Sequence, residues 1–224
     1  MVDFENTKIA FQNRKKRELR WAYFLFNTLG RPLIVKIGKI FIRFSLKTGF
    51  PIKWIVKPTV YKQFCGGETI EECEPVVREM GKYHVRSILD YGVEKKDNPE
   101  DIQVSLEETL RTISNAATNE YIPFAVFKPT AFAGSTLLEK ASSDQKMNEQ
   151  EKLELQEFRH RIDTLCQLAY KNDVPILIDA EEVCIQYIID MVARAMMNKY
   201  NHKKAIVFNT LQMYRWDRLD FLKN

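Results

Sequence analysis

The sequence predicts an α/β fold with a parallel sheet, preceded by an N-terminal helical region. Short, continuously apolar runs alternate with longer stretches of helical periodicity, which is typical of parallel strands covered by helices. Each apolar run also ends in, or runs into, charged or amide side chains. Because parallel strands present their carboxyl ends at one face, where α/β enzymes place their chemistry, we expect these polar groups to converge on a site.

The N-terminal helical region, residues 1–67, is strongly basic. Residues 1–62 carry 14 Lys or Arg against three acids. Apolar residues recur every three or four positions from Leu33 to Phe44, as on one face of an amphipathic helix. Such a segment fits an anionic membrane surface, an acidic partner, or a set of helices whose lysines are simply solvated. Residues 21–62 are the expected site of any peripheral membrane contact.

The second part, residues 68–224, contains about four predicted βα units. Its first helix is expected to begin at a capping box formed by Thr69 and Glu72, and a second capping box is predicted at Ser105 and Glu108. The expected strands are residues 86–90, 123–128, 174–179 and 205–210. The expected loops are residues 95–101 and 141–150, and the later helices are 155–169, 185–196 and 214–222.

Two architectures accommodate these units if their crossovers are right-handed: an open doubly wound sheet and a (β/α) barrel. Neither a G-x-G-x-x-G turn nor a P-loop follows any predicted strand, which counts against an open nucleotide-binding sheet. Four units are half of the eight that close a barrel. A half-barrel would expose two sheet edges and the inner face of its strands.

Composition argues against several functional classes. The apolar runs are far shorter than the ~20 residues that span a membrane, and no signal-peptide cleavage site follows the first of them. The four cysteines and three histidines lack the spacing of a metal site, so we expect a reduced, cytoplasmic protein. The aromatic and basic cluster at residues 214–218 has acidic neighbours and helical spacing, so no nucleic-acid partner is expected.

Five motifs in order along the chain together resemble the proline dehydrogenase family. They are FCGGET at 64–69, ILDYGVE at 88–94, FKPT at 127–130, IDAEE at 178–182 and FNTLQMY at 208–214. That family is a flavin-dependent (β/α)8 barrel that oxidises L-proline to Δ1-pyrroline-5-carboxylate and passes electrons to a membrane quinone. The resemblance covers essentially the whole chain. It implies a partial (β/α)8 TIM-type barrel over residues 68–224, with FAD as the cofactor.

The resemblance also implies roles for four side chains. Lys128 matches the family's lysine near the flavin and the bound proline, and Asp179 matches its acidic partner. Asp90 resembles the first-strand acid that faces the substrate ring, and Gln212 resembles the glutamine that hydrogen-bonds the isoalloxazine edge. We therefore expect catalysis by Lys128 and Asp179, substrate binding by Asp90 and Lys128, and cofactor binding by Lys128, Asp179 and Gln212.

The sequence departs from the family pattern in two respects. The family often has Ser where Gly92 stands. Its later R-G-A-Y-like strand motif and paired arginines, which bind the substrate carboxylate, have no counterpart in these 224 residues. We therefore expect the N-terminal half of such an enzyme, which alone binds FAD poorly and lacks turnover. It would lie in the cytoplasm or peripherally on the inner face of the cell membrane, with Thr130 and Asn209 orienting the site.

Other interpretations of the same residues stay open. Lys128 could be the nucleophile of a Schiff-base lyase of the aldolase type, with Asp179 as its proton partner. The chain could instead be a non-catalytic, membrane-associated scaffold whose residues 21–62 bind lipid. A buried Asp–Lys pair can also serve packing alone. We expect Glu181 and Glu182 to lie in the first turn of the following helix.

Overall fold

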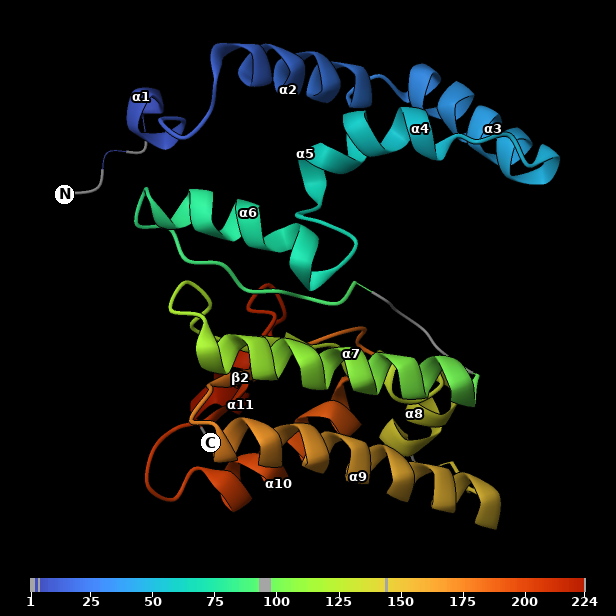
Figure 1. Ribbon diagram of the computed structural model, residues 1–224. Helices are drawn as coiled ribbons and strands as arrows, with labels where there is room; N and C mark the ends of the chain where they lie inside the picture. Colours follow the sequence, from blue (N-terminus) through green and yellow to red (C-terminus); the bar gives the residue numbers. More distant parts are fainter. Residues whose placement is uncertain (1–2, 4, 93–97, 144, 224) are drawn as a thin grey trace. The chain divides into compact units, whose positions relative to one another are not determined.

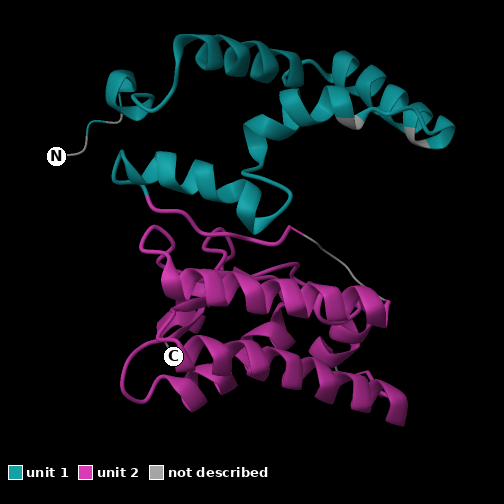
Figure 2. Ribbon diagram, in the orientation of Figure 1, with its two compact units in different colours: residues 1–85 teal, residues 86–224 magenta. Residues whose placement is uncertain are grey.

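The computed structural model describes residue 3 and residues 5–92, 98–143 and 145–223. The chain divides into two compact units, Met1–Val85 and Arg86–Asn224 (Figures 1 and 2). Helix α6 therefore belongs to the first unit. The boundary predicted between residues 67 and 68, which separates the basic helical region from the βα units, stays a prediction.

Unit 1 is helical throughout the part that the structure describes. Its helices are α1 (Thr7–Ala10), α2 (Lys16–Leu29), α3 (Pro32–Thr48), α4 (Lys53–Val56), a π-helical turn (Lys57–Tyr61), α5 (Lys62–Phe64) and α6 (Ile70–Gly81). Pro32 at the first turn of α3 needs no backbone partner, and Gly49 ends that helix with a φ of 71°. The amphipathic helix predicted from Leu33 to Phe44 is confirmed.

The capping box predicted at Thr69 is confirmed in one half only. The Thr69 hydroxyl accepts a hydrogen bond from the Glu72 amide at 3.2 Å. The Glu72 carboxylate, however, accepts from the amide of Glu68 at 2.9 Å instead of reaching the amide of Thr69. Lys57 pairs with both Glu68 and Glu72 at 3.1 Å, which favours this position of the carboxylate.

Unit 2 alternates strands and helices. Its elements are α7 (Pro99–Thr118), β1 (Ala125–Phe127), a 3-10 turn (Pro129–Ala131), α8 (Ser135–Ser142), α9 (Glu149–Lys171), β2 (Ile176–Ile178), α10 (Gln186–Tyr200), β3 (Val207–Asn209) and α11 (Arg218–Lys223). The three strands are parallel and lie in the order β1-β2-β3. Consecutive order with right-handed crossovers places all the connecting helices on one face, as in a barrel.

The first predicted strand, residues 86–90, is reduced to a single parallel bridge between Leu89 and Ala125. Just before it, the Ser87 amide donates to the carbonyl of Tyr121 at 2.9 Å, outside the β1 ladder. The bridge nevertheless places Leu89 next to β1, so four consecutive segments of the chain follow one another across the sheet.

Two local predictions between the strands are wrong. Helix α7 begins at Pro99 with Asn98 as its N-cap, so Ser105 lies inside the helix and its hydroxyl donates to the carbonyl of Asp101 at 2.9 Å. The loop expected at 141–150 shortens because α8 extends to Ser142 and α9 begins at Glu149. Residues 95–97 of the other predicted loop lie outside the described residues.

The core of unit 2 lies between one face of the sheet and the helices. Alternate strand residues are buried, and they pack with α7, α9 and α10 (Figure 1); the buried strand residues are Ala125, Phe127, Ile176, Ile178 and Val207. The opposite face carries Val126, Leu177 and Phe208, which are half-buried. In a closed barrel that face points inward, which explains why its side chains are only partly covered here.

Unit 1 has far fewer buried side chains than unit 2 among the described residues. Among its described residues, the buried side chains are Leu25, Ser45 and Val77. No described helix is long and apolar enough to cross a bilayer.

Replacement of Phe158 by alanine tests where the core lies. Phe158 on α9 is fully buried, so Phe158→Ala should lower the free energy of unfolding by about 3–5 kcal/mol, measured by urea denaturation. The control Trp216→Ala removes a fully exposed ring and should change stability by less than about 0.5 kcal/mol. Equal losses for the two variants would contradict this assignment.

Candidate active site

The register of the sheet brings the predicted strand-end residues into one row. Phe127 pairs with Ile178, and Ile178 pairs with Asn209. The amide of Asp179 donates to the carbonyl of Phe127 at 3.0 Å, and the amide of Thr210 donates to that of Ile178 at 3.1 Å, so the ladder continues by one residue. Lys128, Asp179 and Thr210 therefore follow the three strands side by side, on the half-buried face of the sheet.

Lys128 lies between two carboxylates at this edge. Its Nζ is 3.2 Å from Oδ2 of Asp90 and 3.9 Å from Oδ2 of Asp179. The lysine side chain is 21% exposed and both carboxylates are 37% exposed, so the cluster is reachable from solvent. The structure thus brings together Lys128, Asp90 and Asp179, three of the four residues predicted for the site. The chemical roles predicted for these residues stay predictions.

Thr210 holds the Asp179 carboxylate in place. The Thr210 hydroxyl accepts a hydrogen bond from the amide of Ala180 at 2.7 Å and donates to Oδ1 of Asp179 at 3.1 Å. The second oxygen of Asp179 is thereby left to face Lys128. Sequence reasoning missed Thr210, although its place two residues after Phe208 on a strand was a signal for the same face.

Gln212, the fourth predicted residue, lies on the loop after β3. Its Nε2 donates to the carbonyl of Ala180 at 3.3 Å, and its Oε1 accepts from the hydroxyl of Tyr214 at 3.2 Å. The amide is therefore tied to the residue that follows Asp179.

Glu181 precedes the following helix and does not lie in its first turn, contrary to the prediction. Helix α10 begins at Gln186, so neither Glu181 nor Glu182 lies in its first turn. The Glu181 carboxylate instead accepts from the amide of Thr130 at 2.8 Å and from its hydroxyl at 2.5 Å. Burial raises the pKa of this carboxyl, while the hydrogen bonds from Thr130 and the charge of Lys128 act in the opposite direction.

A buried carboxylate, Asp190 on α10, collects hydrogen bonds from several segments. Its Oδ1 accepts from Nε2 of Gln186 at 2.8 Å and from Nδ2 of Asn209 at 3.0 Å. Its Oδ2 accepts from Nη1 of Arg218 at 2.5 Å, and both side chains of this ion pair are at most 10% exposed. Asn209 thus supports β3 from behind the sheet, and its own Oδ1 is buried without a hydrogen-bond partner among the described residues.

Gln186 extends this arrangement to the other two strand ends. Its Oε1 accepts from the amide of Glu181 at 2.9 Å. Through Glu181 the hydrogen bonds reach Thr130, two residues beyond Lys128. The loops after β1, β2 and β3 are therefore connected through one buried polar network.

The groups at this edge suit substrate positioning and electrostatic stabilisation. Among the described residues, no group of His, Cys, Asp or Glu could hold a metal ion. What the edge offers is a cation between carboxylates, with amide and hydroxyl groups beside it. These groups can bind and orient a charged small molecule or a cofactor with polar edges.

The fold and the site define the class of protein: a segment of a (β/α)8 barrel with an acid–lysine cluster at the carboxyl ends of its strands. A family model described as "Proline dehydrogenase" matches residues 73–224, more than half of the chain, and the chain belongs to that family. The resemblance noted in the sequence is thereby confirmed.

Curated relatives agree with this assignment. Proline dehydrogenase 1, mitochondrial, of Dictyostelium discoideum is 27% identical over 99% of this chain and 46% of its own length. The carbapenem antibiotics biosynthesis protein CarD of Pectobacterium carotovorum is 28% identical over 71% of this chain and 42% of its own length. This chain therefore spans about half the length of the curated relatives it matches.

Solved structures show the fold. Proline utilization A from Bdellovibrio bacteriovorus matches with a TM-score of 0.58 and 16% identity, over 72% of this chain and 18% of that one. The Bradyrhizobium japonicum protein matches with a TM-score of 0.52 and 17% identity, over 70% and 16% of the two chains. The proline dehydrogenase domains of these neighbours are (β/α)8 barrels, so the predicted partial barrel is confirmed.

Removal of the Asp190 carboxylate should destabilise the chain strongly. Asp190→Ala removes the acceptor shared by Gln186, Asn209 and Nη1 of the buried Arg218, while Arg218 keeps its pair with Asp217, and we expect a loss of about 3 kcal/mol in the free energy of unfolding. The control Lys204→Ala breaks an exposed pair with Asp173 and should cost at most about 1 kcal/mol. If chemical denaturation showed the same loss in the free energy of unfolding for this variant and its control, the buried network would be dispensable for stability.

Glu181 should make stability depend on pH. Because its folded pKa lies above the ordinary value of 4.5, the folded chain binds the proton more tightly, and this stabilisation is lost as pH rises from the ordinary carboxyl range through the folded pKa. Glu181→Gln cannot ionise, so its stability relative to the unmodified chain should improve as pH rises from 4 to 8. Urea midpoints that stay parallel across this range would refute the shift.

Proposed function

We propose that this chain forms the first half of the catalytic barrel of an FAD-dependent proline dehydrogenase. The enzyme would oxidise L-proline to Δ1-pyrroline-5-carboxylate and pass the electrons to a quinone. The observation that carries the proposal is the position of Lys128 between Asp90 and Asp179, at the carboxyl edge of a sheet in a member of this family. Strand ends of this kind are where barrel enzymes place their chemistry.

The donor set at this edge fits a flavin. Lys128 supplies a cation and Gln212 an amide, and these two side chains would hold the pyrimidine side of the ring together with Asp179. When bound, the flavin supplies the hydride acceptor. A fixed ammonium near the pyrimidine side favours the negative charge that reduction places there.

The residues of the chain itself would prepare the substrate. Asp90 and Asp179 surround Lys128 with more negative than positive charge, which suits the cationic ring nitrogen of L-proline. Thr210 fixes the Asp179 carboxylate before substrate arrives, and the Asp190 network fixes the adjoining end of β3, so little reorganisation is needed during the reaction.

The Schiff-base lyase makes a different prediction for Lys128, because it needs this side chain to attack a carbonyl carbon as a nucleophile. Under our proposal, borohydride with a carbonyl substrate should leave Lys128 unlabelled. The scaffold alternative would be favoured by liposome binding without any flavin binding.

The quinone, the cytoplasmic location and peripheral membrane contact remain parts of the proposal. The relatives from Dictyostelium discoideum and Schizosaccharomyces pombe are named as mitochondrial proteins. Because the chain spans about half the length of its relatives, the proposed activity belongs to the complete barrel.

Lys128→Met tests the proposal directly. Expressed from its complete reading frame with FAD, the protein should reduce a quinone in the presence of L-proline, and Lys128→Met should lower kcat by about 100-fold or more because a charge aimed at the reaction is lost. The matched control Lys152→Met removes an exposed lysine paired with Glu149 and should leave kcat unchanged.

Two outcomes would contradict the proposal. No proline-dependent reduction by the flavin-loaded complete protein would exclude the activity, and an unchanged kcat for Lys128→Met would exclude the role of Lys128. The 224 residues alone should bind FAD weakly and show no turnover. Full activity of these residues alone would refute the half-barrel assignment.

A further inference from the structure

The carboxylate of Glu181 joins two loops of the site. Both of its oxygens bind one residue: Oε1 accepts from the amide of Thr130 at 2.8 Å, and Oε2 accepts from its hydroxyl at 2.5 Å. Thr130 follows Lys128 by two residues, and Glu181 follows Asp179 by two residues. A closed ring therefore runs from Lys128 to Thr130, across to Glu181 and back to Asp179, whose carboxylate lies 3.9 Å from the lysine.

This link lies where the pairing of β1 with β2 ends. The amide of Asp179 donates to the carbonyl of Phe127, and Lys128 then precedes the 3-10 turn Pro129–Ala131. The proline at the start of this turn has no amide hydrogen, so it cannot donate to the ladder. The Glu181 side chain thus connects the two segments just beyond the ladder bond of Asp179.

Both ends of the link are held in the interior. Thr130 is 1% exposed, and Glu181 is half-buried. The backbone amide of Glu181 donates to Oε1 of Gln186 at 2.9 Å, and Gln186 is itself 2% exposed. Burying a carboxylate is costly unless its hydrogen bonds are satisfied, so a side chain with this arrangement indicates a specific role.

The turn after Lys128 has a second anchor, which does not involve Asp179. Nη1 of Arg161 on α9 donates to the carbonyl of Phe132 at 3.1 Å. The ring of Phe132 is fully buried and packs edge-on against that of Phe127. Loss of the Glu181 carboxylate should therefore leave the turn folded, while its first residues are freed relative to Asp179.

We propose that Glu181 is a positioning residue of the active site. Its carboxylate holds the turn that follows Lys128 against the segment that contains Asp179, and so sets the distance between the Lys128 ammonium and the Asp179 carboxylate. This inference rests on the proposed function, since it concerns the site around Lys128. It assigns to Glu181 an effect on the reaction that acts through Lys128.

Substitutions in the flavin-loaded protein expressed from its complete reading frame test this role. Glu181→Gln leaves one acceptor oxygen for the two donors of Thr130, and Thr130→Val removes the hydroxyl donor. Each should lower kcat by about tenfold, less than Lys128→Met does, because the lysine is displaced and not removed. Thr130→Ser keeps both donors and should retain the unmodified kcat.

The double variant Glu181→Gln with Thr130→Val tests whether the two side chains act as one link. Because both substitutions break the same contact, the double variant should have a kcat within about twofold of the poorer single variant.

The reduction potential of the bound flavin separates positioning from a direct effect of charge. Removal of a negative charge makes reduction easier and shifts the potential to a more positive value. A displaced Lys128 ammonium stabilises the reduced ring less and shifts it to a more negative value. Thr130→Val changes no charge, so we expect a negative shift in redox titration at pH 8, smaller than that of Lys128→Met.

The reactivity of Lys128 gives a readout that needs neither flavin nor activity. In the protein without FAD, Glu181→Gln and Thr130→Val should raise the rate at which acetic anhydride labels Lys128 by about threefold or more, because a weaker ion pair leaves more of the amine neutral. Mass spectrometry would measure this rate relative to the exposed Lys152.

The labelling also keeps this inference separate from the proposed function. If the unmodified, flavin-loaded protein showed no proline-dependent reduction, the proposed function would fail. The labelling of Lys128 would still decide whether Glu181 positions that side chain.

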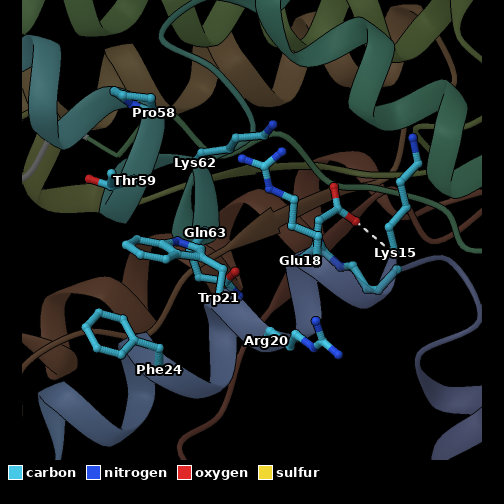
Figure 3. Close-up of a pocket in the computed structure, with 11 residues that line it drawn as sticks. Lys15, Glu18, Arg20, Trp21, Phe24, Pro58, Thr59, Lys62 and Gln63 are labelled. Atoms are coloured by element: carbon cyan, nitrogen blue, oxygen red, sulfur yellow. Dashed lines mark hydrogen bonds between the residues drawn. The ribbon is translucent and has the colours of Figure 1, made fainter.

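Glu18→Gln is the matched control. Figure 3 shows Glu18 in unit 1, where it lines a cavity of about 910 Å³ and accepts from the amide of Lys15 at 2.9 Å. Glu18 is likewise a half-buried carboxylate bonded to a backbone amide, but it belongs to a different unit from Lys128. This control should leave kcat, the potential and the labelling of Lys128 unchanged.

Four results would overturn the proposal. One is unchanged labelling of Lys128 in both Glu181→Gln and Thr130→Val. Another is a positive shift of the potential in Glu181→Gln with an unchanged potential in Thr130→Val, which would indicate a direct effect of charge. A third is additive losses of kcat in the double variant. The last is an altered circular dichroism spectrum for both single variants, which would assign the link to folding.

Discussion

The buried ion pair between Asp190 and Arg218 is the interaction on which the arrangement of the strand ends depends. A carboxylate inside a protein is tolerated only when its oxygens are hydrogen-bonded, and here Gln186 and Asn209 share one oxygen while Arg218 takes the other. Since these partners belong to different segments, satisfying one charge fixes the positions of several loops. The network therefore stabilises a geometry as well as the fold.

The Asp190 network lies on the helix side of the sheet, and the site residues lie on the opposite face. Parallel pairing places Lys128, Asp179 and Thr210 in one row, and alternation along each strand points them away from the helices. Asn209, one residue before Thr210, is held by Asp190 on the helix side. Two neighbouring residues at the end of β3 thus have different roles: Asn209 is bonded to the supporting network, and Thr210 is bonded to the site residue Asp179. A change in the core can therefore move the cluster around Lys128.

The sequence predicted the parallel sheet, the later helices and the meeting of Lys128, Asp90 and Asp179, because strand ends and apolar periodicity are local signals. Glu181 was placed wrongly, since its partners on Thr130 lie 51 residues away and leave no local pattern. Ser105 matched a capping pattern, but Asn98 and Pro99 offered a better start for the helix. Asp190 looked like an ordinary helix residue, because its role is defined only when α11 packs against α10.

The most direct test of this account is a crystal structure of the protein expressed from its complete reading frame. The account predicts that the Lys128 ammonium lies within about 4 Å of a carboxylate oxygen of Asp90 or Asp179, with Thr210 bonded to Asp179. Lys128 and Asp179 on opposite faces of the sheet, or on opposite rims of the closed barrel, would contradict it.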